Sequence, residues 1–167
     1  GDGVYKLRNM TVAVFGLGGV GGYVVEALAR SGVGHLILTD HDTVSITNIN
    51  RQIIALQSTV GMLKTEAAKA RILDINPNCE VTVHSCFYTG NEFELDNFDY
   101  IADAIDSVSS KLALIENAIK NNIPIISSMG TGNKLDPTKL VVTDISKTEM
   151  CPLAKIVRTQ LRKRGIN

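Results

Sequence analysis

The chain has 167 residues, and its 17 Lys and Arg side chains balance its 17 Asp and Glu side chains. This length suffices for one well-buried core, and the absence of a Pro-, Gly- or Ser-rich linker argues against two domains. A net charge of zero excludes a global field that would draw the chain to nucleic acid or lipid, so any polyanion site must be a local patch.

The composition also bears on the cellular compartment. No stretch reaches the roughly 18 apolar residues of a membrane span, and residues 1–9 lack the charged and apolar regions of a signal peptide. Cys79, Cys86 and Cys151 are odd in number and form no C-x-x-C pair. This pattern disfavours a disulfide framework and a four-thiolate zinc site. We therefore expect a soluble cytoplasmic protein with three free thiols.

A glycine-rich turn follows the first predicted strand. Residues 11–15 (TVAVF) predict the strand, and residues 23–30 predict a helix. Five glycines lie between them: Gly16, Gly18, Gly19, Gly21 and Gly22. The first, second and fourth fit G-x-G-x-x-G, in which missing Cβ atoms let backbone N–H groups approach a phosphate at a helix N-terminus. The turn predicts a nucleotide without saying which; glycines that merely let strand and helix pack closely are the alternative.

The second predicted strand ends at an acidic residue. Residues 35–39 (HLILT) are a buried run, and Asp40 follows nineteen positions after Gly21. A dinucleotide-binding fold places there the acid that binds ribose hydroxyls, so Asp40 is the predicted ribose ligand. A strand-end carboxylate satisfied by a local turn is the alternative.

Residues 42–60 do not continue the alternation of strands and helices, and they predict a long loop or short helix. Loops of this length in compact domains are often functional. The segment carries Asn48, Asn50, Arg51 and Gln52 close together. Arg51 offers a fork of donors suited to phosphate oxygens, which makes it a candidate phosphate clamp. A solvated surface arginine is the alternative.

A helix is predicted over residues 62–75, capped by Ser58 or Thr59, with Lys64 in its first turn. A cation at that end opposes the helix dipole by about 0.3–1 kcal/mol and becomes favourable when a polyphosphate binds there. Lys64 is therefore a candidate phosphate ligand, with a solvated lysine as the alternative.

A fourth predicted strand delivers a second acid to the site. Strands are expected over residues 80–86 and 100–105, with a short amphipathic helix and loop over residues 89–99. In doubly wound sheets, strands one and four flank the point where the strand order reverses, so Asp106 should face the glycine turn. Mg²⁺ demands oxygen ligands, which makes Asp106 the predicted metal ligand. Asp103, inside the strand, is expected to have a structural hydrogen-bonding role.

The C-terminal part completes the predicted fold. It comprises a helix capped by Ser109 or Ser110, a strand opened by Pro124, and a second glycine loop over residues 128–132 that lines the pocket or forms a plain turn. A further strand is expected over residues 140–145 (LVVTDI). Together the elements predict an α/β fold: a Rossmann-like, doubly wound, mostly parallel sheet with helices on both faces.

The last predicted helix, over residues 152–164, is basic. Its cations are Lys155, Arg158, Arg162, Lys163 and Arg164. Such a face is typical of a solvated helix with cations near its C-terminus, and nucleic-acid contact is the alternative.

Five blocks occur in an order that resembles the ATP-dependent adenylating domain shared by ThiF, MoeB, HesA and ubiquitin-activating enzymes. They are GLGGVGG, LTDHD, TNINRQ, Lys64 and DAIDSV. The resemblance implies that residues 1–167 are a single ATP-binding adenylating domain, in which the glycine loop and Asp40 hold ATP and Asp106 binds Mg²⁺. The residues that it implies for the phosphates and the pocket are Asn48, Arg51, Gln52 and Lys64. Arg51, Lys64 and Asp106 are then the catalytic residues.

Within this superfamily, the segments NINRQI, DAIDSV, KLALI, DPTKLVVTDISKT and CPLA look most like the tRNA threonylcarbamoyladenosine dehydratases. The likeness implies ATP-dependent adenylation of a carboxylate on tRNA, followed by cyclisation with loss of water. It also implies a homodimer, tRNA as the substrate and sulfur-transfer proteins as further partners. Zinc-binding C-x-x-C pairs typical of MoeB and ThiF are missing from the sequence, which disfavours the alternative, adenylation of a ubiquitin-like sulfur carrier.

Two departures accompany the resemblance. His41 stands where relatives often carry an apolar residue near adenine. The N-terminal helix of the family and the chain beyond its last helix are not recognised, so we expect a domain truncated at both ends, with impaired activity. Two other classes stay open: an NAD-dependent oxidoreductase, which leaves Arg51, Lys64 and Asp106 without a shared purpose, and a nucleotide-binding adaptor without turnover.

Overall fold

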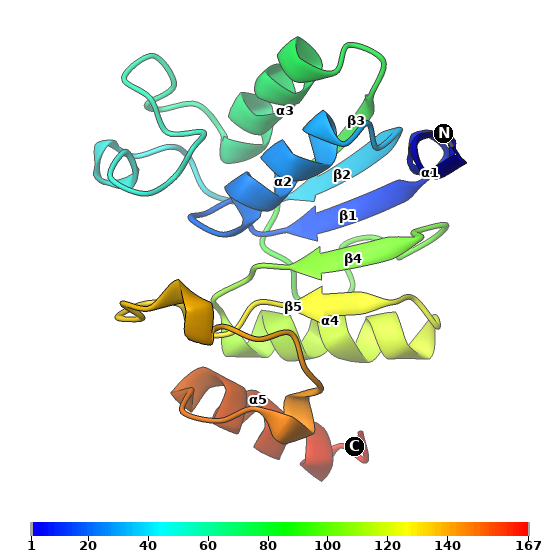
Figure 1. The fold of residues 1–167 in the computed structure, drawn as a ribbon, viewed down its shortest axis with the longest axis vertical. Helices are drawn as coiled ribbons and strands as arrows, with labels where there is room; N and C mark the ends of the chain where they lie inside the picture. The colour runs from blue at the N-terminus through cyan, green and yellow to red at the C-terminus, as the bar shows by residue number, and fades with distance from the viewer. Residues whose placement is uncertain (1, 167) are drawn as a thin grey trace.

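The computed structural model describes residues 2–166, in which five parallel strands form one sheet of order β3-β2-β1-β4-β5 (Figure 1). The strands are β1 (Thr11–Phe15), β2 (His35–Thr39), β3 (Glu80–His84), β4 (Tyr100–Asp103) and β5 (Ile125–Ser127). The central three consist almost wholly of buried residues, as expected for parallel strands covered on both faces. The order reverses between β1 and β4, as the sequence predicts.

The strand register aligns the carboxyl end of the sheet. Phe15 of β1 is paired with Thr39 of β2 and with Asp103 of β4. The residues that follow these three strands therefore emerge side by side, which brings the glycine turn, Asp40 and the segment leading to Asp106 to one edge.

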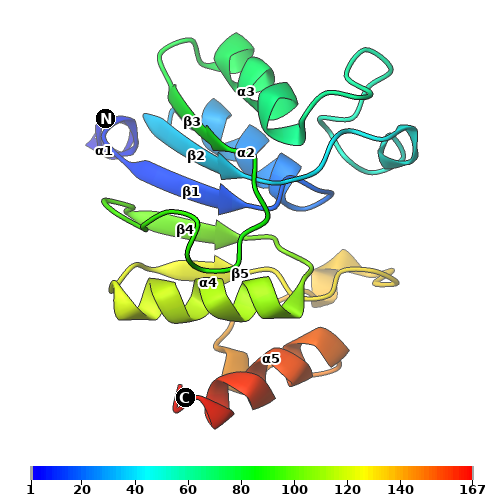
Figure 2. The ribbon, with the colours of Figure 1, turned by 180° about the vertical axis from the view of Figure 1, so that it is seen from behind.

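Helices cover both faces of the sheet (Figures 1 and 2). The main helices are α2 (Gly21–Arg30), α3 (Lys64–Ile75), α4 (Val108–Lys120) and α5 (Pro152–Lys163). One core joins α2 and α3 to the face that carries Val14 and Leu36, and a second joins α4 and the loop over residues 85–99 to the face that carries Phe15 and Ile101. A third apolar cluster lies between α4 and α5. No helix in the described range is long and apolar enough to cross a membrane.

The predicted caps of two helices are wrong, because α3 begins after Leu63 and α4 after Ser107, neither with a side-chain cap. Three predictions about whole elements are also wrong. Residues 140–145 form no strand: Val141 and Val142 are exposed and lie between the one-turn 3-10 helices η2 (Pro137–Lys139) and η3 (Ile145–Lys147). Residues 89–99 form a loop instead of a helix. In that loop the Glu92 carboxylate accepts the backbone N–H groups of Thr89, Gly90 and Asn91, which closes a tight turn.

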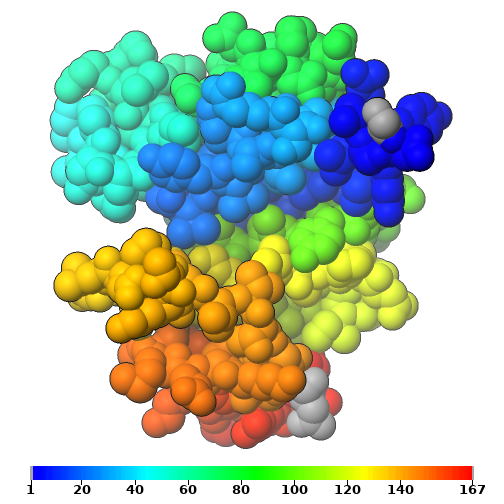
Figure 3. All heavy atoms as spheres, viewed as in Figure 1, coloured from blue at the N-terminus to red at the C-terminus, as the bar shows by residue number. Residues whose placement is uncertain are grey.

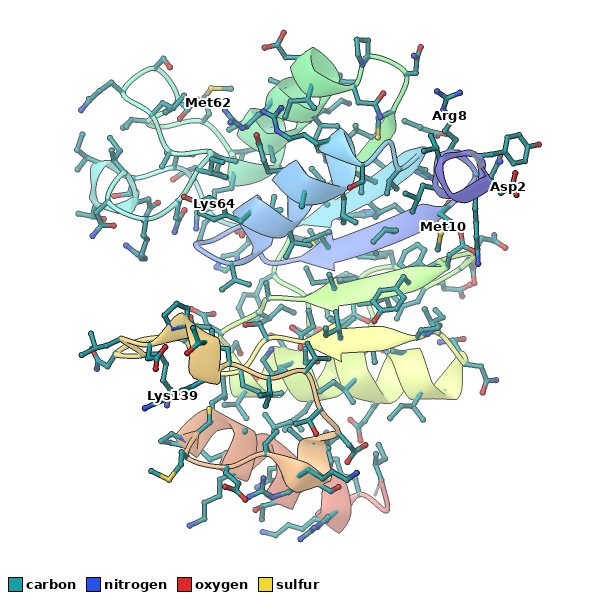
Figure 4. All side chains as sticks on the ribbon, viewed as in Figure 1. Asp2, Arg8, Met10, Met62, Lys64 and Lys139 are labelled. Carbon is teal, nitrogen blue, oxygen red and sulfur yellow. The ribbon has the colours of Figure 1, made fainter. Side chains whose placement is uncertain are left out.

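The third wrong prediction concerns the N-terminus, where a short helix, α1 (Asp2–Arg8), precedes β1. Its acidic first turn and basic last turn match the helix dipole. Figure 4 shows Arg8 at the edge of the sheet opposite to Lys64, so this arginine does not reach the carboxyl ends of the strands.

Candidate nucleotide-binding site

A cavity of about 680 Å³ lies at the carboxyl edge of the sheet. This size falls in the range of small-molecule sites. Nine of the ten residues predicted for the site line it: Gly16, Gly18, Gly19, Asp40, Asn48, Arg51, Gln52, Lys64 and Asp106. In Figure 3 the molecule is hollowed at the left edge between the loop over residues 41–63 (cyan) and the segment over residues 131–151 (gold to orange). The structure thus gathers side chains from four separate stretches of sequence around one space.

Gly21, the tenth residue, shapes the turn from outside the cavity. A Cβ atom there would lie 1.7 Å from the carbonyl oxygen of Gly16, and one on Gly16 would lie 2.6 Å from that of Ala104. Gly16 also has a φ of +85°, a conformation that L side chains rarely adopt. The close backbone packing that the sequence left as one alternative is therefore present at Gly21 and Gly16, while Gly18 and Gly19 line the cavity.

Asp40 ties the second strand to the glycine turn. One oxygen of its carboxylate accepts the N–H of Leu17 at 2.7 Å, and the other accepts the N–H of Asp42 at 2.8 Å. Each oxygen keeps a lone pair for a further donor. The local-turn role and a ribose-binding role are thus compatible, because the turn fixes the carboxylate on the cavity wall.

The loop over residues 43–63 is closed at its neck by an antiparallel bridge between Thr43 and Leu63. Asp42 and Lys64 lie just outside this bridge, where the N–H of Lys64 donates to the carbonyl of Asp42 at 2.9 Å. The Lys64 side chain is buried, and its Nζ lies 2.8 Å from a carboxylate oxygen of Asp42. This hydrogen bond lowers the pKa of Asp42 against the opposing effect of burial. Sequence reasoning missed Asp42, whose only signal was an unexplained lysine at a helix N-terminus.

The same loop supplies Asn48 and Arg51 to the cavity lining. The amide oxygen of Asn48 accepts the N–H of Ser45, which caps the one-turn helix η1 (Ile46–Asn48) and leaves the amide N–H₂ group available. Arg51 is exposed and its guanidinium donates to Asn50 at 2.9 Å, while its Cγ would lie 3.6 Å from a Cβ added to Gly19. Arg51 therefore presents donors beside the glycine turn.

Asp106 lies across the cavity from the glycine turn, three residues beyond β4. It is exposed, and within residues 2–166 its carboxylate accepts no hydrogen bond. Asp103 holds this segment in place, because its carboxylate accepts the N–H of Ile105 at 3.0 Å and the ammonium of Lys111 at 2.7 Å. The Asp103 and Lys111 side chains are fully buried, and Lys111 also donates to the carbonyl of Ser128 at 3.0 Å. The structural role predicted for Asp103 is confirmed.

The rim beyond β2 combines aromatic and charged groups. The rings of His41 and Phe87 meet edge to face at 4.9 Å, and His41 Nε2 lies 3.1 Å from Asp42. Asp40, His41 and Asp42 are close enough to share a metal ion. Because both carboxylates already accept hydrogen bonds, one of them from the Lys64 ammonium, we assign no metal to this cluster.

Buried polar atoms without partners also lie on the cavity wall. In the described part of the chain these atoms are Thr39 Oγ1, Gln52 Oε1 and Ser110 Oγ, and all three residues line the cavity. An unsatisfied buried polar group costs about 1–3 kcal/mol, so each indicates a group supplied by a ligand or water. The sequence predicted a role for Gln52 and not for Thr39 or Ser110.

A free cysteine lies at the start of α5. Burial opposes ionisation of Cys151, but hydrogen bonds from the backbone N–H groups of Ala154 and Gly130 lower the pKa of its thiol. Its Sγ accepts the N–H of Ala154 at 3.5 Å, so the thiol acts as the helix N-cap.

The strand order, the glycine turn and the cavity at the point of reversal define a Rossmann-like α/β protein with a cavity at the place where this fold class binds nucleotides. The model of the ThiF family matches residues 1–165, and the chain belongs to this family.

Curated relatives support the same assignment. The chain is 54% identical over 168 residues to the tRNA threonylcarbamoyladenosine dehydratase of Bacillus subtilis, an alignment that covers 99% of this chain and 66% of the relative. It is 45% identical over 154 residues to the protein of that name from Escherichia coli, covering 90% and 58%. The chain thus spans two thirds or less of the length of these relatives.

Solved structures agree with the fold. The E. coli dehydratase TcdA in complex with ATP superposes with a TM-score of 0.94 at 42% identity, covering 96% of this chain and 68% of that chain. E. coli MccB with ATP gives a TM-score of 0.68 at 28% identity, covering 74% and 38%. The Rossmann-like fold predicted from the sequence is therefore confirmed.

Proposed function

We propose that this chain is the ATP-binding, adenylating domain of a tRNA threonylcarbamoyladenosine dehydratase. One observation carries the proposal: Arg51, Lys64 and Asp106, from three separate elements, line the same cavity as the glycine turn. An NAD-dependent dehydrogenase would need the turn and Asp40 but would give these three residues no common task. The similarity to bacterial dehydratases, one solved with ATP, supports the same conclusion.

The cavity offers ATP a complementary set of groups. Backbone N–H groups of the glycine turn and the N-terminus of α2 suit a phosphate, and the Asp40 carboxylate suits ribose hydroxyls. Arg51 and Lys64 supply positive charge for the outer phosphates. The unpartnered atoms of Thr39 and Gln52 provide hydrogen-bonding capacity on the same wall. Ser110 does so on the opposite side, at the first turn of α4.

Asp106 suits Mg²⁺. Its exposed carboxylate is uncommitted within the described residues, and Asp103 fixes the segment that presents it. Mg²⁺ takes oxygen ligands and keeps several waters, so a single protein carboxylate beside a triphosphate is a sufficient anchor. When bound, the ion would neutralise negative charge on the phosphates.

The proposed reaction activates a carboxylate. The carboxyl group of the threonylcarbamoyl modification attacks the α-phosphate of ATP, and pyrophosphate leaves as an acyl-adenylate forms. Attack from within the modification then closes a ring and expels AMP, so the net change in the tRNA is loss of water. This chain contributes positioning and charge: Lys64 and Arg51 stabilise phosphate charge as it develops, and we assign no general base.

Further parts of the proposal concern assembly and setting. Exposed apolar side chains gather in the segment over residues 135–150: Leu135, Leu140, Val141, Val142 and Met150. Contiguous exposed apolar groups mark interaction surfaces, so we assign this segment to a homodimer interface. Modification of tRNA implies a cytoplasmic protein. A sulfur-transfer partner stays a prediction.

The deciding experiment measures AMP release from ATP with tRNA that carries threonylcarbamoyladenosine, with the unmodified tRNA as control. We expect ATP binding by calorimetry and AMP release that depends on the modification. Release that requires a ubiquitin-like carrier protein and ignores tRNA would reassign the enzyme to carrier activation. Tight ATP binding with no AMP release under either condition would favour the adaptor.

A further inference from the structure

The zero net charge of the chain conceals a division into two oppositely charged parts. Residues 131–167 contain eight Lys and Arg side chains against three Asp and Glu, a net charge of five positive. Residues 1–130 contain nine against fourteen, a net charge of five negative. A polyanion is therefore attracted to the C-terminal part and repelled by the rest.

The fold turns this positive charge outward on one helix. α5 packs its Val157 and Leu161 against α4, which fixes the face that it buries. Lys155 and Arg162, seven residues apart, share one face of the helix, which lies outside that contact. Lys155, Arg162 and the adjacent Lys163 are exposed. Within residues 2–166 none of these three cations forms an ion pair.

Two other arginines of this segment hold α5 in place. Arg158 donates to the carbonyl of Thr148 at 3.0 Å and to its hydroxyl at 2.6 Å, which fastens the preceding segment to the helix. Arg164 pairs with Glu116 of α4. The uncommitted cations therefore lie on a helix that is anchored near its middle and at its C-terminal end.

The direction of α5 connects this surface to the cavity. Leu153, in the first turn, lines the cavity wall. In Figure 1 the helix then runs from the carboxyl edge of the sheet towards the opposite edge, ending near the C-terminus. A helix of 12 residues is about 18 Å long, so Lys155 lies near the cavity end and Arg162 and Lys163 near the far end.

We infer that the outer face of α5, formed by Lys155, Arg162 and Lys163, is the docking surface for the sugar-phosphate backbone of the RNA substrate. The inference rests on the proposed function, because it gives the tRNA a path that leads to the cavity. Phosphate contacts from Lys and Arg fix the position of a nucleic acid and supply most of its sequence-independent affinity. A modified base at the cavity end of this path enters the site, while flanking phosphates stay on the helix.

The test compares two charge-reversed variants of equal net charge. Lys155→Glu/Arg162→Glu removes the surface, and the matched control, Lys6→Glu/Lys120→Glu, reverses two exposed lysines in the last turns of α1 and α4. Binding of labelled tRNA is measured over a series of salt concentrations, with ATP affinity as the measure of an intact fold. Lys155→Gln/Arg162→Gln is the milder version.

We expect the surface variant to bind tRNA at least tenfold more weakly. Its plot of log K against log salt should be flatter by about 1.4–1.8, the contribution of two lost phosphate contacts. Its ATP affinity should stay at the wild-type value, and the control should match the wild type in both measurements. Wild-type tRNA affinity and salt slope in both surface variants would overturn the docking surface while leaving the proposed function intact. A wild-type protein that binds ATP but no tRNA would overturn both.

Discussion

The ammonium of Lys64, at the first position of α3, lies 2.8 Å from the carboxylate of Asp42, 22 residues earlier in the chain. Lys64 is 6% exposed, whereas about half of the Asp42 side chain is in contact with solvent. The positive charge of Lys64, which opposes the dipole of α3, is therefore paired with the Asp42 carboxylate, and Asp42 also lines the cavity. We expect Asp42 to position Lys64 and the phosphates of a bound nucleotide to replace or share this partner.

The first prediction follows from that pair. Asp42→Ala leaves a buried ammonium without its acceptor, so we expect the free energy of unfolding to fall by about 1–3 kcal/mol in urea titrations. ATP affinity should fall by about tenfold, because Lys64 is no longer held on the cavity wall. Asp96→Ala, at an exposed loop position, is the control and should change neither quantity. An unchanged ATP affinity in Asp42→Ala would show that Lys64 needs no positioning partner.

The second prediction concerns catalysis. Lys64→Ala and Asp106→Ala should each reduce AMP release with modified tRNA at least a hundredfold, because each removes charge that offsets the developing phosphate charge. Lys69→Ala, on the same helix and outside the cavity lining, is the matched control for Lys64. Wild-type turnover in either variant would remove that residue from the proposed machinery.

The third prediction separates the two roles of the glycine turn. Gly21→Ala places a Cβ 1.7 Å from the Gly16 carbonyl, so we expect insoluble protein or a loss of more than about 1–3 kcal/mol, the usual cost of overpacking. Gly18→Ala meets Gln52 at 3.7 Å, an ordinary contact, so its fold should persist while ATP affinity falls. Thermal unfolding and calorimetry check both. Equal stability of the two variants would mean that the close approach at Gly21 relaxes freely.

The fourth prediction concerns pH. Burial lowers the pKa of His84, whose ring stacks on Phe93 at 3.8 Å. The unfolded chain therefore binds a proton more readily than the folded chain, and stability falls as the pH drops below about 6.5. In His84→Phe, which keeps the stacking, the melting temperature should vary less between pH 7.5 and 5.5. Identical pH profiles for the variant and the wild type would assign the dependence to other groups.

The sequence predicted the strands that consist of a continuous run of buried apolar residues. Residues 11–15 and 35–39 became β1 and β2 with the predicted bounds, because parallel strands covered on both faces need continuous apolar residues. Residues 140–145 satisfy the same pattern, yet Val142 is 87% exposed. An apolar run indicates that a segment needs to be covered. It does not indicate whether the protein's own sheet or another surface covers it.

The sequence predicted most residues of the candidate site but not the contacts between them. Glycine spacing and strand-end acids indicated the turn, Asp40 and Asp106, because the topology of a doubly wound sheet brings such positions together. The pairing of Asp42 with Lys64 depends on the bridge that closes the loop over residues 43–63, and nothing local in the sequence specifies that bridge. The hydroxyls of Thr39 and Ser110 have no hydrogen-bond partner within the described residues. This too is a consequence of tertiary packing, which the local sequence does not specify.

The buried ammonium of Lys111 links α4 to β4 and to the segment after β5. It reaches Asp103 at the end of β4 and the carbonyl that follows β5, a strand of only three residues. In amide hydrogen exchange, β4, α4 and β5 should therefore open as one cooperative unit, while β1, β2 and β3 with α2 and α3 form another. The cavity lies at the boundary between the two units. A nucleotide that contacts both Asp40 and Asp106 would therefore hold the two units together across the sheet.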